Sequence, residues 1–195
     1  TLMNYIGIGA IVALGLVLLT GLGGLTSFGQ AALVGIGAYS TAWLTVKVGL
    51  SPWLGLLLAL IMTGGVALLV GFITLRVGGH YLPLSTIAWG IAIYFLFANI
   101  PGLGQHDGIA GIPPISIAGW SFASNSAVYY LIWIALGLAM VGISHLLDSR
   151  EGRVVRGLRG GATMLASVGV GLFRMRLIIV VSAALLAGIA GWLYA

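Results

Sequence analysis

Long apolar runs separated by short polar or glycine-rich breaks make up the whole sequence. Several of the runs reach the roughly 20 residues that a helix needs to cross a bilayer, without a charged side chain. We expect membrane spans near residues 2–20, 30–46, 53–75, 82–99, 127–147 and 177–195. The breaks between them fall at 21–29, 47–52, 76–80, 99–126 and 148–176. The pattern predicts an all-α polytopic membrane protein with about six transmembrane helices, in one domain over residues 1–195.

The composition agrees with a lipid environment. Hydrophobic residues make up 61% of the chain and charged residues 6%, whereas about a quarter of the residues of soluble domains are charged. The 32 glycines fit membrane helices that pack closely through small residues. Cysteine is absent and the three histidines are separated in sequence, so we expect no metal and no other cofactor in this chain. Because the chain begins and ends inside apolar runs, we expect a fragment that is incomplete at both ends.

Positive charge is concentrated in one interval. Six of the eight Lys and Arg residues lie there: Arg150, Arg153, Arg156, Arg159, Arg174 and Arg176. Short loops rich in arginine stay in the cytoplasm, so residues 148–176 are predicted to form a cytoplasmic loop. Alternation along the chain then places Arg76 inside and the interval 99–126 outside, with Lys47 as the single exception. Since the basic residues lie between spans, we do not expect nucleic acid as a partner.

Several kinds of functional site are absent from the sequence. A P-loop requires Gly-Lys-Ser/Thr, but the only lysine, Lys47, lies between two valines, so the chain has no such nucleotide-binding motif. The break GLGGLTSFG carries Thr26 at the third glycine position of a dinucleotide-binding loop and does not follow a strand. The acidic residues Asp107, Asp148 and Glu151 all fall in loops, which disfavours a proton-driven carrier. The spans hold no paired carboxylates and no nucleophile beside a base, so we do not expect an enzyme.

The glycine-rich break raises a hypothesis about a solute path. In several transporters, interrupted helices present backbone N–H groups to a polar solute. Thr26 or Ser27 could cap the helix that begins near Gln30, and these three residues would then line the path. A plain turn between two helices is the alternative.

Small residues recur on one face of two spans. They are Ala31, Gly35, Ala38 and Ala42 in the second span, and Ala184, Gly188, Gly191 and Ala195 in the last. Steps of three and four place each set on one side of a helix. We expect these faces to pack against other helices, and a groove that binds a ligand is the alternative.

Four motifs resemble one transporter family. LTGLGGLTSFGQAALVGIGAYSTAWL at 19–44 resembles the G-L-x-S-F-G-(Q/H)-A-A-F-x-G-I-G-A-Y pattern of LivM-type permeases of branched-chain amino acid ABC importers. LRVGGHYLPLSTIAWGIAIYFLF at 75–97 is similar to the next signature, an Arg/Gly turn followed by Tyr and a Thr-x-Ala span. GLGQHDGIAGIPP at 102–114 places Asp107 and Gly108 on the family's external G-G-x-D-G-x-x-G-I-P loop. SREGRVVRGLRGGATMLASVGVGLFRMR resembles its cytoplasmic S-R-x-G-R-x-x-R-A-I-R segment, so the likeness covers essentially the whole chain.

The chain departs from the family pattern at four positions. Gly160 and Gly161 replace an acidic residue or a polar pair, and Pro83 replaces a common alanine. We interpret these three as marks of a subfamily. Gln105 replaces a usual glycine, which bears on the local turn of the external loop.

The resemblance implies a permease subunit of an ABC importer in the bacterial plasma (inner) membrane. A second permease subunit would help to enclose the path, and membrane lipid would surround both. Two cytoplasmic ABC ATPase subunits would use the ATP, and an extracytoplasmic substrate-binding protein would deliver the solute. Branched-chain amino acids are the expected solutes, although relatives also handle urea or amides. A self-sufficient channel or secondary carrier for a small polar solute is the alternative.

The resemblance also suggests roles for two loops. Within 148–176, Arg153, Arg156 and Arg159 would fan across a helix, and the short apolar helix that runs from Ala162 to its end at Gly169 would couple to an ATPase groove. An interfacial helix whose arginines bind anionic headgroups is the alternative. The proline-containing interval 99–126 would receive the binding protein. There Asp107 either pairs with a basic residue of that protein or is a solvated turn residue.

Overall fold

The computed structural model describes residues 2–77, 81–105, 107–117, 120–121, 124–167 and 169–195. The long helices are α1 (Leu2–Leu16), α2 (Gln30–Lys47), α3 (Pro52–Val77), α4 (Leu82–Asn99), α5 (Asn125–Asp148), α6 (Arg150–Ser167) and α7 (Leu172–Tyr194). A π-helix, η1 (Val17–Leu22), continues α1, and a short 3-10 helix, η3 (Pro101–Leu103), follows α4. The prediction of an all-α membrane protein is confirmed, with one small addition, an antiparallel pair of two-residue strands, β1 (Ser116–Ile117) and β2 (Trp120–Ser121).

One predicted boundary is wrong in an informative way. The last helix begins at Leu172 and not near 177, so Arg174 and Arg176 lie in its first turns and not in the preceding loop. Arginine is a good helix former and can extend its charged end to the membrane surface. Hydropathy therefore marked only the apolar part of this helix.

Five helices among the described residues are long and apolar enough to cross a membrane, one fewer than predicted. Of the six predicted spans, the one that is not among them is α2, which contains Gln30, Thr41, Thr45 and Lys47. The first three of these side chains are buried inside the bundle. The second apolar run is therefore a helix whose polar side chains Gln30, Thr41 and Thr45 face its neighbours in the bundle.

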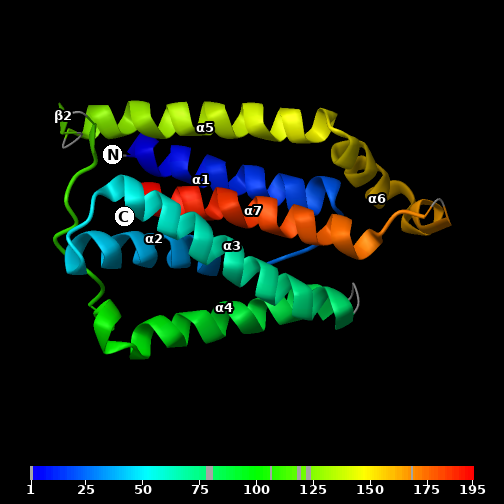
Figure 1. Ribbon diagram of the computed structural model, residues 1–195, viewed down its shortest axis with the longest axis horizontal. Coiled ribbons are helices and arrows are strands. Elements are labelled where there is room, and N and C mark those ends of the chain that lie inside the picture. The colour runs from blue at the N-terminus through cyan, green and yellow to red at the C-terminus, as the bar shows by residue number, and fades with distance from the viewer. Residues whose placement is uncertain (1, 78–80, 106, 118–119, 122–123, 168) are drawn as a thin grey trace.

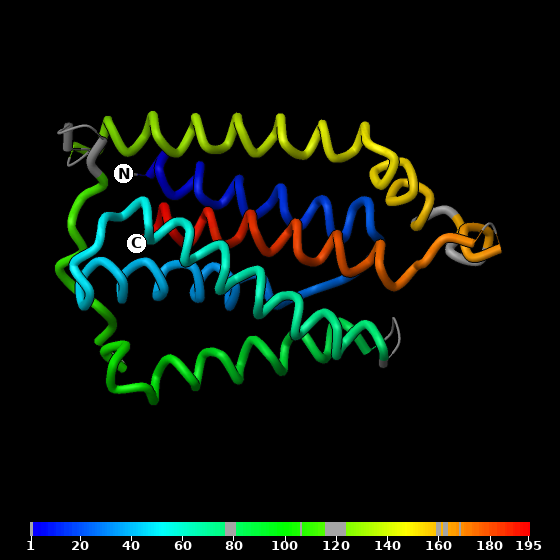
Figure 2. Tube along the Cα trace, viewed as in Figure 1, coloured from blue at the N-terminus to red at the C-terminus, as the bar shows by residue number. Residues whose placement is uncertain are grey.

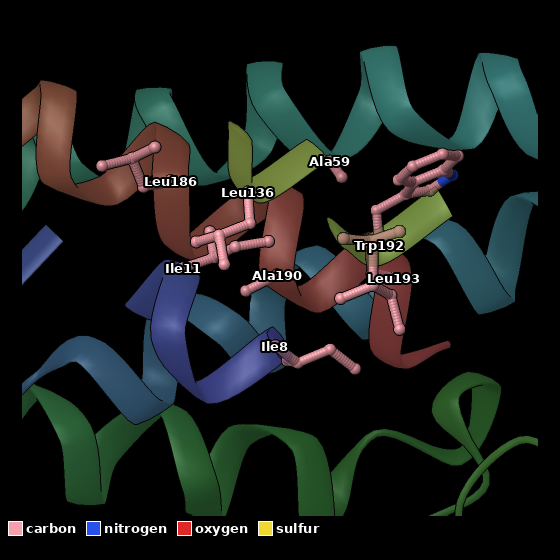
Figure 3. Close-up of a cluster of buried hydrophobic side chains, with 9 residues drawn as sticks. Ile8, Ile11, Ala59, Leu136, Leu186, Ala190, Trp192 and Leu193 are labelled. Atoms are coloured by element: carbon pink, nitrogen blue, oxygen red, sulfur yellow. The ribbon is translucent and has the colours of Figure 1, made fainter. Parts of the chain in front are cut away.

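The helices lie side by side with α7 at the centre (Figures 1 and 2). More than half of the α7 segment is buried (56%), against 11% of α4, so α7 is the core helix and α4 lies at an edge. α5 lies at the opposite edge, and α6 extends beyond one end of the bundle. Figure 3 shows part of the core, where Ile11 of α1, Ala59 of α3 and Ala190 of α7 are fully buried.

The two ends of the bundle follow the predicted alternation of the chain (Figure 1). α6 and the end of α3 with Arg76 lie at one end, whereas the end of α2 with Lys47 and the interval between α4 and α5 lie at the other. The side of the membrane that each end faces stays a prediction. It rests on the arginine bias alone.

Glycines bring α2, α3 and α7 into backbone contact. A Cβ atom at Gly37 of α2 would lie 2.8 Å from the carbonyl oxygen of Gly188 on α7. A Cβ at Gly191 would lie 2.8 Å from the backbone nitrogen of Ala38 and 3.0 Å from Cα of Gly37. The predicted small-residue face of the last span is therefore a packing face. The predicted face of the second span does not pack against one helix. Gly37, which was not part of that face, makes the closest approach to α7, and Gly35 faces Phe97 of α4, where a Cβ would lie 3.1 Å from the aromatic ring.

The interval between α4 and α5 contains a tight turn in which Gly104 and Gly108 have φ values of 78° and 71°. Gln105 between them also adopts a positive φ, 52°, so the turn forms although the side chain replaces a glycine. Asp107 is exposed and donates its backbone N–H to Gly104 O at 3.1 Å. Within the described residues Asp107 forms no ion pair, which agrees with a solvated turn residue.

Candidate functional site

The first helix ends irregularly, near the end of the bundle that carries α6 (Figures 1 and 2). The hydroxyl of Thr20 donates to Leu16 O at 2.7 Å, and the helix widens into the π-helix η1. Gly24 then takes a positive φ of 63°, which ends the helix and reverses the chain. Figures 1 and 2 show the following segment as a nearly straight run that returns into the bundle and leads to α2.

The start of α2 lies level with the middle of α7. A Cβ atom on Gly15 of α1 would meet Ala183 O of α7 at 3.1 Å and Nε2 of Gln30 at 3.3 Å. Gln30 is the first residue of α2, and Ala183 is the central residue of α7. The residue that precedes α2, Gly29, gives no side-chain cap, so among the described residues no N-cap side chain satisfies the first N–H groups of the helix. The helix before the break, Leu2–Leu22, is long enough to cross a membrane, whereas the second span consists of an extended segment and then α2, which starts at the depth of the bundle centre; we call this second span the interrupted helix.

The three residues predicted to line a path point in different directions. Thr26 is exposed, and Ser27 lines a cavity. Gln30 is only 5% exposed and lies between α1 and α7, where its Oε1 accepts no hydrogen bond. The predicted cap is wrong, because the Ser27 hydroxyl accepts from Gly29 N–H at 3.4 Å and bonds to no N–H of α2. Ser27 bonds to Gly29, two residues later and still before α2. Its side chain therefore stays outside the first turn of the helix.

The cavity beside Ser27 has a volume of about 50 Å³ and lies where η1, α2, α3, α4 and α7 meet. Thr86 of α4 closes one side: its hydroxyl accepts from Phe28 N–H at 3.1 Å and donates to Pro83 O at 2.9 Å. The rest of the wall is apolar apart from Thr74 and the indole of Trp89. The apolar residues are Leu19, Gly29, Ala32, Leu33, Val66, Ala67, Val70, Gly71, Leu82, Gly90, Ile93 and Val180.

Two further cavities continue from this one along α2. The next, of about 460 Å³, lies between α2 and α4 and shares Ala32, Gly90 and Ile93 with the first. The third, of about 320 Å³, shares Tyr39 with the second and reaches Ile109 and Ile112 of the interval between α4 and α5. The small residues of the second span line these spaces: Ala31 and Gly35 line the second cavity, and Ala38 and Ala42 line the third.

We call this series the α2 track. It runs from the interval between α4 and α5 to the start of α2, with Tyr39 and Phe97 stacked 4.5 Å apart beside its middle section. The small residues of α2 therefore both pack against neighbouring helices and line a groove, and the binding of a ligand in this groove stays a prediction.

The predicted coupling loop forms one kinked helix. α6 is interrupted at Gly161, whose φ of 175° and ψ of 75° are not helical, so the double-glycine joint is present. The second half ends with Val170 N–H donating to Leu165 O at 3.1 Å and Gly169 N–H donating to Ala166 O at 3.0 Å. Gly169 has a φ of 83°, so these two bonds form a Schellman cap at the predicted helix end.

The arginines of α6 hold the joint between α5 and α6. Arg153 donates to the carbonyl oxygen of Asp148 at 3.2 Å, and Arg156 forms an ion pair with the Asp148 carboxylate at 3.3 Å. Both partners of the ion pair are more than half exposed, so the pair adds about 0–1 kcal/mol to stability. The side chains of Arg159 and Ala162 lie outside the part of the chain that the structure describes.

The arginine half of α6 is also amphipathic, which the arginine pattern alone did not reveal. Val155 is 3% exposed and Leu158 is 8% exposed, and both join one apolar cluster. That cluster includes Leu18 and Leu19 of η1 and Leu25 of the break; its other buried members are Leu82, Ile179 and Ala183. One apolar contact surface therefore connects α6 to the interrupted helix.

The joint between α5 and α6 explains why the basic motif begins with Ser149 and contains Gly152. Ser149 donates its hydroxyl to Leu146 O at 2.6 Å and accepts from Gly152 N–H at 3.1 Å, which caps α6. A Cβ atom at Gly152 would collide with backbone atoms of Leu146 and Leu147. Only glycine fits where the two helices meet so closely.

The sequence was also compared with known proteins. All residues, 1–195, match the family described as the branched-chain amino acid transport system permease component. The chain belongs to this permease family. It is similar to the high-affinity branched-chain amino acid transport system permease protein LivM of Escherichia coli strain K12, and equally to LivM of Salmonella typhimurium strain LT2. In each case the identity is 31% over 181 residues.

The alignment covers 80% of this chain and 43% of each relative, so the permease chain spans less than half the length of these curated relatives. No solved structure matches the chain. Membership of the family, together with the apolar helices, establishes a multi-pass membrane protein of a transport system.

Sequence reasoning missed three parts of this site. Thr86 is the threonine of the Thr-x-Ala part of the second motif, but its role was missed because only the fold places it beside Phe28. Gly37 was overlooked because the regular spacing of the neighbouring small residues favoured another face. Val155 and Leu158 were detectable, since their spacing of three coincides with the spacing of the arginines and predicts an amphipathic helix.

Proposed function

We propose that this chain is the permease subunit of an ABC importer and that its solute crosses the membrane along the α2 track. One observation carries the proposal: three cavities that share lining residues lead from the external interval to an interrupted helix at the centre of the bundle. Interrupted helices offer backbone groups to a solute where a continuous helix cannot. Such an arrangement suits passage of a small polar molecule with apolar parts.

Branched-chain amino acids are the proposed solutes. The names of the family and of both relatives support this class. The cavity at the start of α2 supports it independently, because its wall is mostly aliphatic and its polar groups are hydroxyls, with no charged side chain among its lining residues. Urea or amides would find few hydrogen-bond partners on such a wall.

The proposed partners follow from the two ends of the bundle. Two ABC ATPase subunits would bind at α6, where the exposed Met164 in its apolar second half needs a cover. The binding protein would dock on the opposite end, near Asp107 and Gly108, and a second permease subunit would close the α2 track. α6 would then face the cytoplasm of a bacterial inner membrane, in agreement with the arginine bias. ATP is used by the partner subunits, and we propose no cofactor in this chain.

A self-sufficient channel or secondary carrier was the other interpretation of the sequence. Family membership supports the importer permease and not this alternative. The three acidic residues of the sequence offer nothing to a proton-driven carrier within the spans, since Asp107, Asp148 and Glu151 all lie near the ends of the bundle.

Gly90→Phe is expected to block uptake. Gly90 lines both the cavity at the start of α2 and the next one, and open space surrounds the position of its missing Cβ. A benzyl group can therefore enter the track without displacing a helix. We expect leucine uptake by the complete transporter in proteoliposomes to fall at least tenfold. Normal uptake would exclude the α2 track as the path.

Gly65→Phe is the matched control. Gly65 is exposed on α3, also has open space around its missing Cβ, and lines none of the three cavities of the track. The same change of residue should therefore leave uptake at the wild-type rate. Binding of the ATPase subunits, measured by co-purification, should persist in both variants.

Gly169→Val is expected to impair coupling at α6. The positive φ at this position costs an ordinary residue roughly 1–2 kcal/mol, and a β-branched residue adopts it least readily. The Schellman cap would open and change the direction in which α6 leads into α7. We expect ATP-driven uptake to fall several-fold, while Gly169→Asn, which tolerates this conformation, keeps most of it. Equal uptake by the two variants would show that the cap has no role in coupling.

A further inference from the structure

We propose that the 50 Å³ cavity at the start of α2 is a side-chain pocket that selects solutes by size. This inference rests on the proposed function and assigns one part of the α2 track a specific role. The aliphatic side chain of the solute enters the pocket, and its amino and carboxylate groups stay in the adjoining cavity of about 460 Å³. The pocket thereby selects three- or four-carbon side chains and rejects an aromatic ring.

The volume supports this size limit. A water-sized group needs about 10–15 Å³ of cavity measured in this way, so about 50 Å³ accommodates three to five such groups. The side chains of valine, leucine and isoleucine contain three or four carbon atoms. The benzyl group of phenylalanine is about twice that size and exceeds the space.

The walls of the pocket also suit an aliphatic group. Val66, Val70 and Ile93 supply apolar contacts from α3 and α4, and the half-buried Trp89 supplies a flat apolar surface. Thr74 and Thr86 are buried, and their hydroxyl protons are already donated to Val70 O and Pro83 O. An alkyl group that enters the pocket therefore breaks no hydrogen bond of these two threonines.

The position of the pocket separates the two ends of the solute. Ala32, Gly90 and Ile93 form the boundary that the pocket shares with the wider cavity. Ser27 lies at the pocket wall beside the uncapped start of α2. Its hydroxyl accepts from Gly29 N–H, and within the described residues no acceptor takes its proton, so this proton is available to the solute. Ser27 and Thr86 are thus the polar side chains of the pocket beside the break, and Thr74 and the Trp89 indole are the polar groups on the other walls.

Residues 1–195 contain no cysteine, which allows a direct test: a thiol introduced there is followed by mass spectrometry of its own peptide, apart from any thiol of the partner subunits. In the complete transporter with the variant Ser27→Cys, alkylation of the thiol by iodoacetamide, a linear reagent whose reacting end is a single methylene group, is measured with and without each amino acid. We expect valine, leucine and isoleucine to slow alkylation at least fivefold and phenylalanine to leave the rate unchanged. The control Thr26→Cys carries an exposed thiol next to the pocket and should react at one rate throughout.

A second variant tests the size limit. Replacing the indole in Ser27→Cys/Trp89→Ala enlarges the pocket, so phenylalanine should now slow alkylation, with its half-maximal concentration lowered roughly tenfold. The proposal would be overturned if phenylalanine protected the thiol of the Ser27→Cys variant as well as leucine does. It would also be overturned if no amino acid protected this thiol. Wild-type transporter that fails to take up leucine would instead overturn the proposed function. Normal wild-type uptake without protection of the thiol would overturn the pocket alone.

Discussion

Gly191→Val is expected to prevent the central helices from assembling. A Cβ at this position would collide with Val34 O and would lie 2.8 Å from the backbone nitrogen of Ala38. These are backbone atoms of α2, so no side chain can rotate to make room. Overpacking of a well-packed core typically costs about 1–3 kcal/mol, and separation of two helices would cost more. We expect little monodisperse protein after extraction in detergent, measured by fluorescence-detected size exclusion.

Gly9→Val provides the control for this prediction. Gly9 lies on α1, and nothing surrounds the position of its missing Cβ within 4 Å. The same substitution there should give protein with the elution profile and melting temperature of the wild type. If Gly191→Val also melted at the wild-type temperature, α2 and α7 would not be in backbone contact.

Leu158→Asp is expected to reduce ATP-driven leucine uptake at least tenfold, although the chain still inserts. Leu158 is 8% exposed in the apolar cluster that joins α6 to Leu18, Leu19 and Leu25. A carboxylate in this place is desolvated without a partner, which costs several kcal/mol, so α6 would detach from η1. A movement of α6 could then no longer reach the break at the start of α2. Uptake and ATPase activity are to be measured together in proteoliposomes.

The conservative variant Leu158→Met is the control for the loss of apolar contact at this position. Methionine keeps the apolar volume, and such exchanges usually cost less than about 1.5 kcal/mol, so uptake should stay near the wild-type rate. Basal ATPase activity of the bound subunits should be similar in both variants, because neither substitution touches a nucleotide. Normal uptake by Leu158→Asp would mean that α6 acts on the membrane part through another contact. It would also favour the interpretation of α6 as an interfacial, lipid-binding helix.

Local sequence signals determined the helical elements. Apolar runs bounded by glycine and proline predicted α4 at its observed limits, and the glycine pair and Gly169 predicted the kink and the end of α6. These features depend on backbone conformations that few residues adopt, so the sequence states them directly. The permease family was also identifiable, because its motifs lie in the breaks and loops where such residues concentrate.

The tertiary structure alone decided how the elements are used. Thr26, Ser27 and Gln30 are close in sequence, but the return of the chain between η1 and α2 sends their side chains to the surface, to a cavity and to the α1–α7 contact. Thr86 enters the same site from α4. Contacts between residues so distant in sequence depend on the order of helix packing, which hydropathy does not encode.

The sequence by itself therefore determined the membrane environment, the helices, their alternation and the family. It did not determine that α2 starts level with the centre of α7, that Gly37 and not its regularly spaced neighbours meets Gly188, or that α6 rests on η1. The physical reason is the same in each case. In lipid every helix face is apolar, so the choice between packing face, cavity wall and lipid surface is made by shape, and shape complementarity exists only once the helices are assembled.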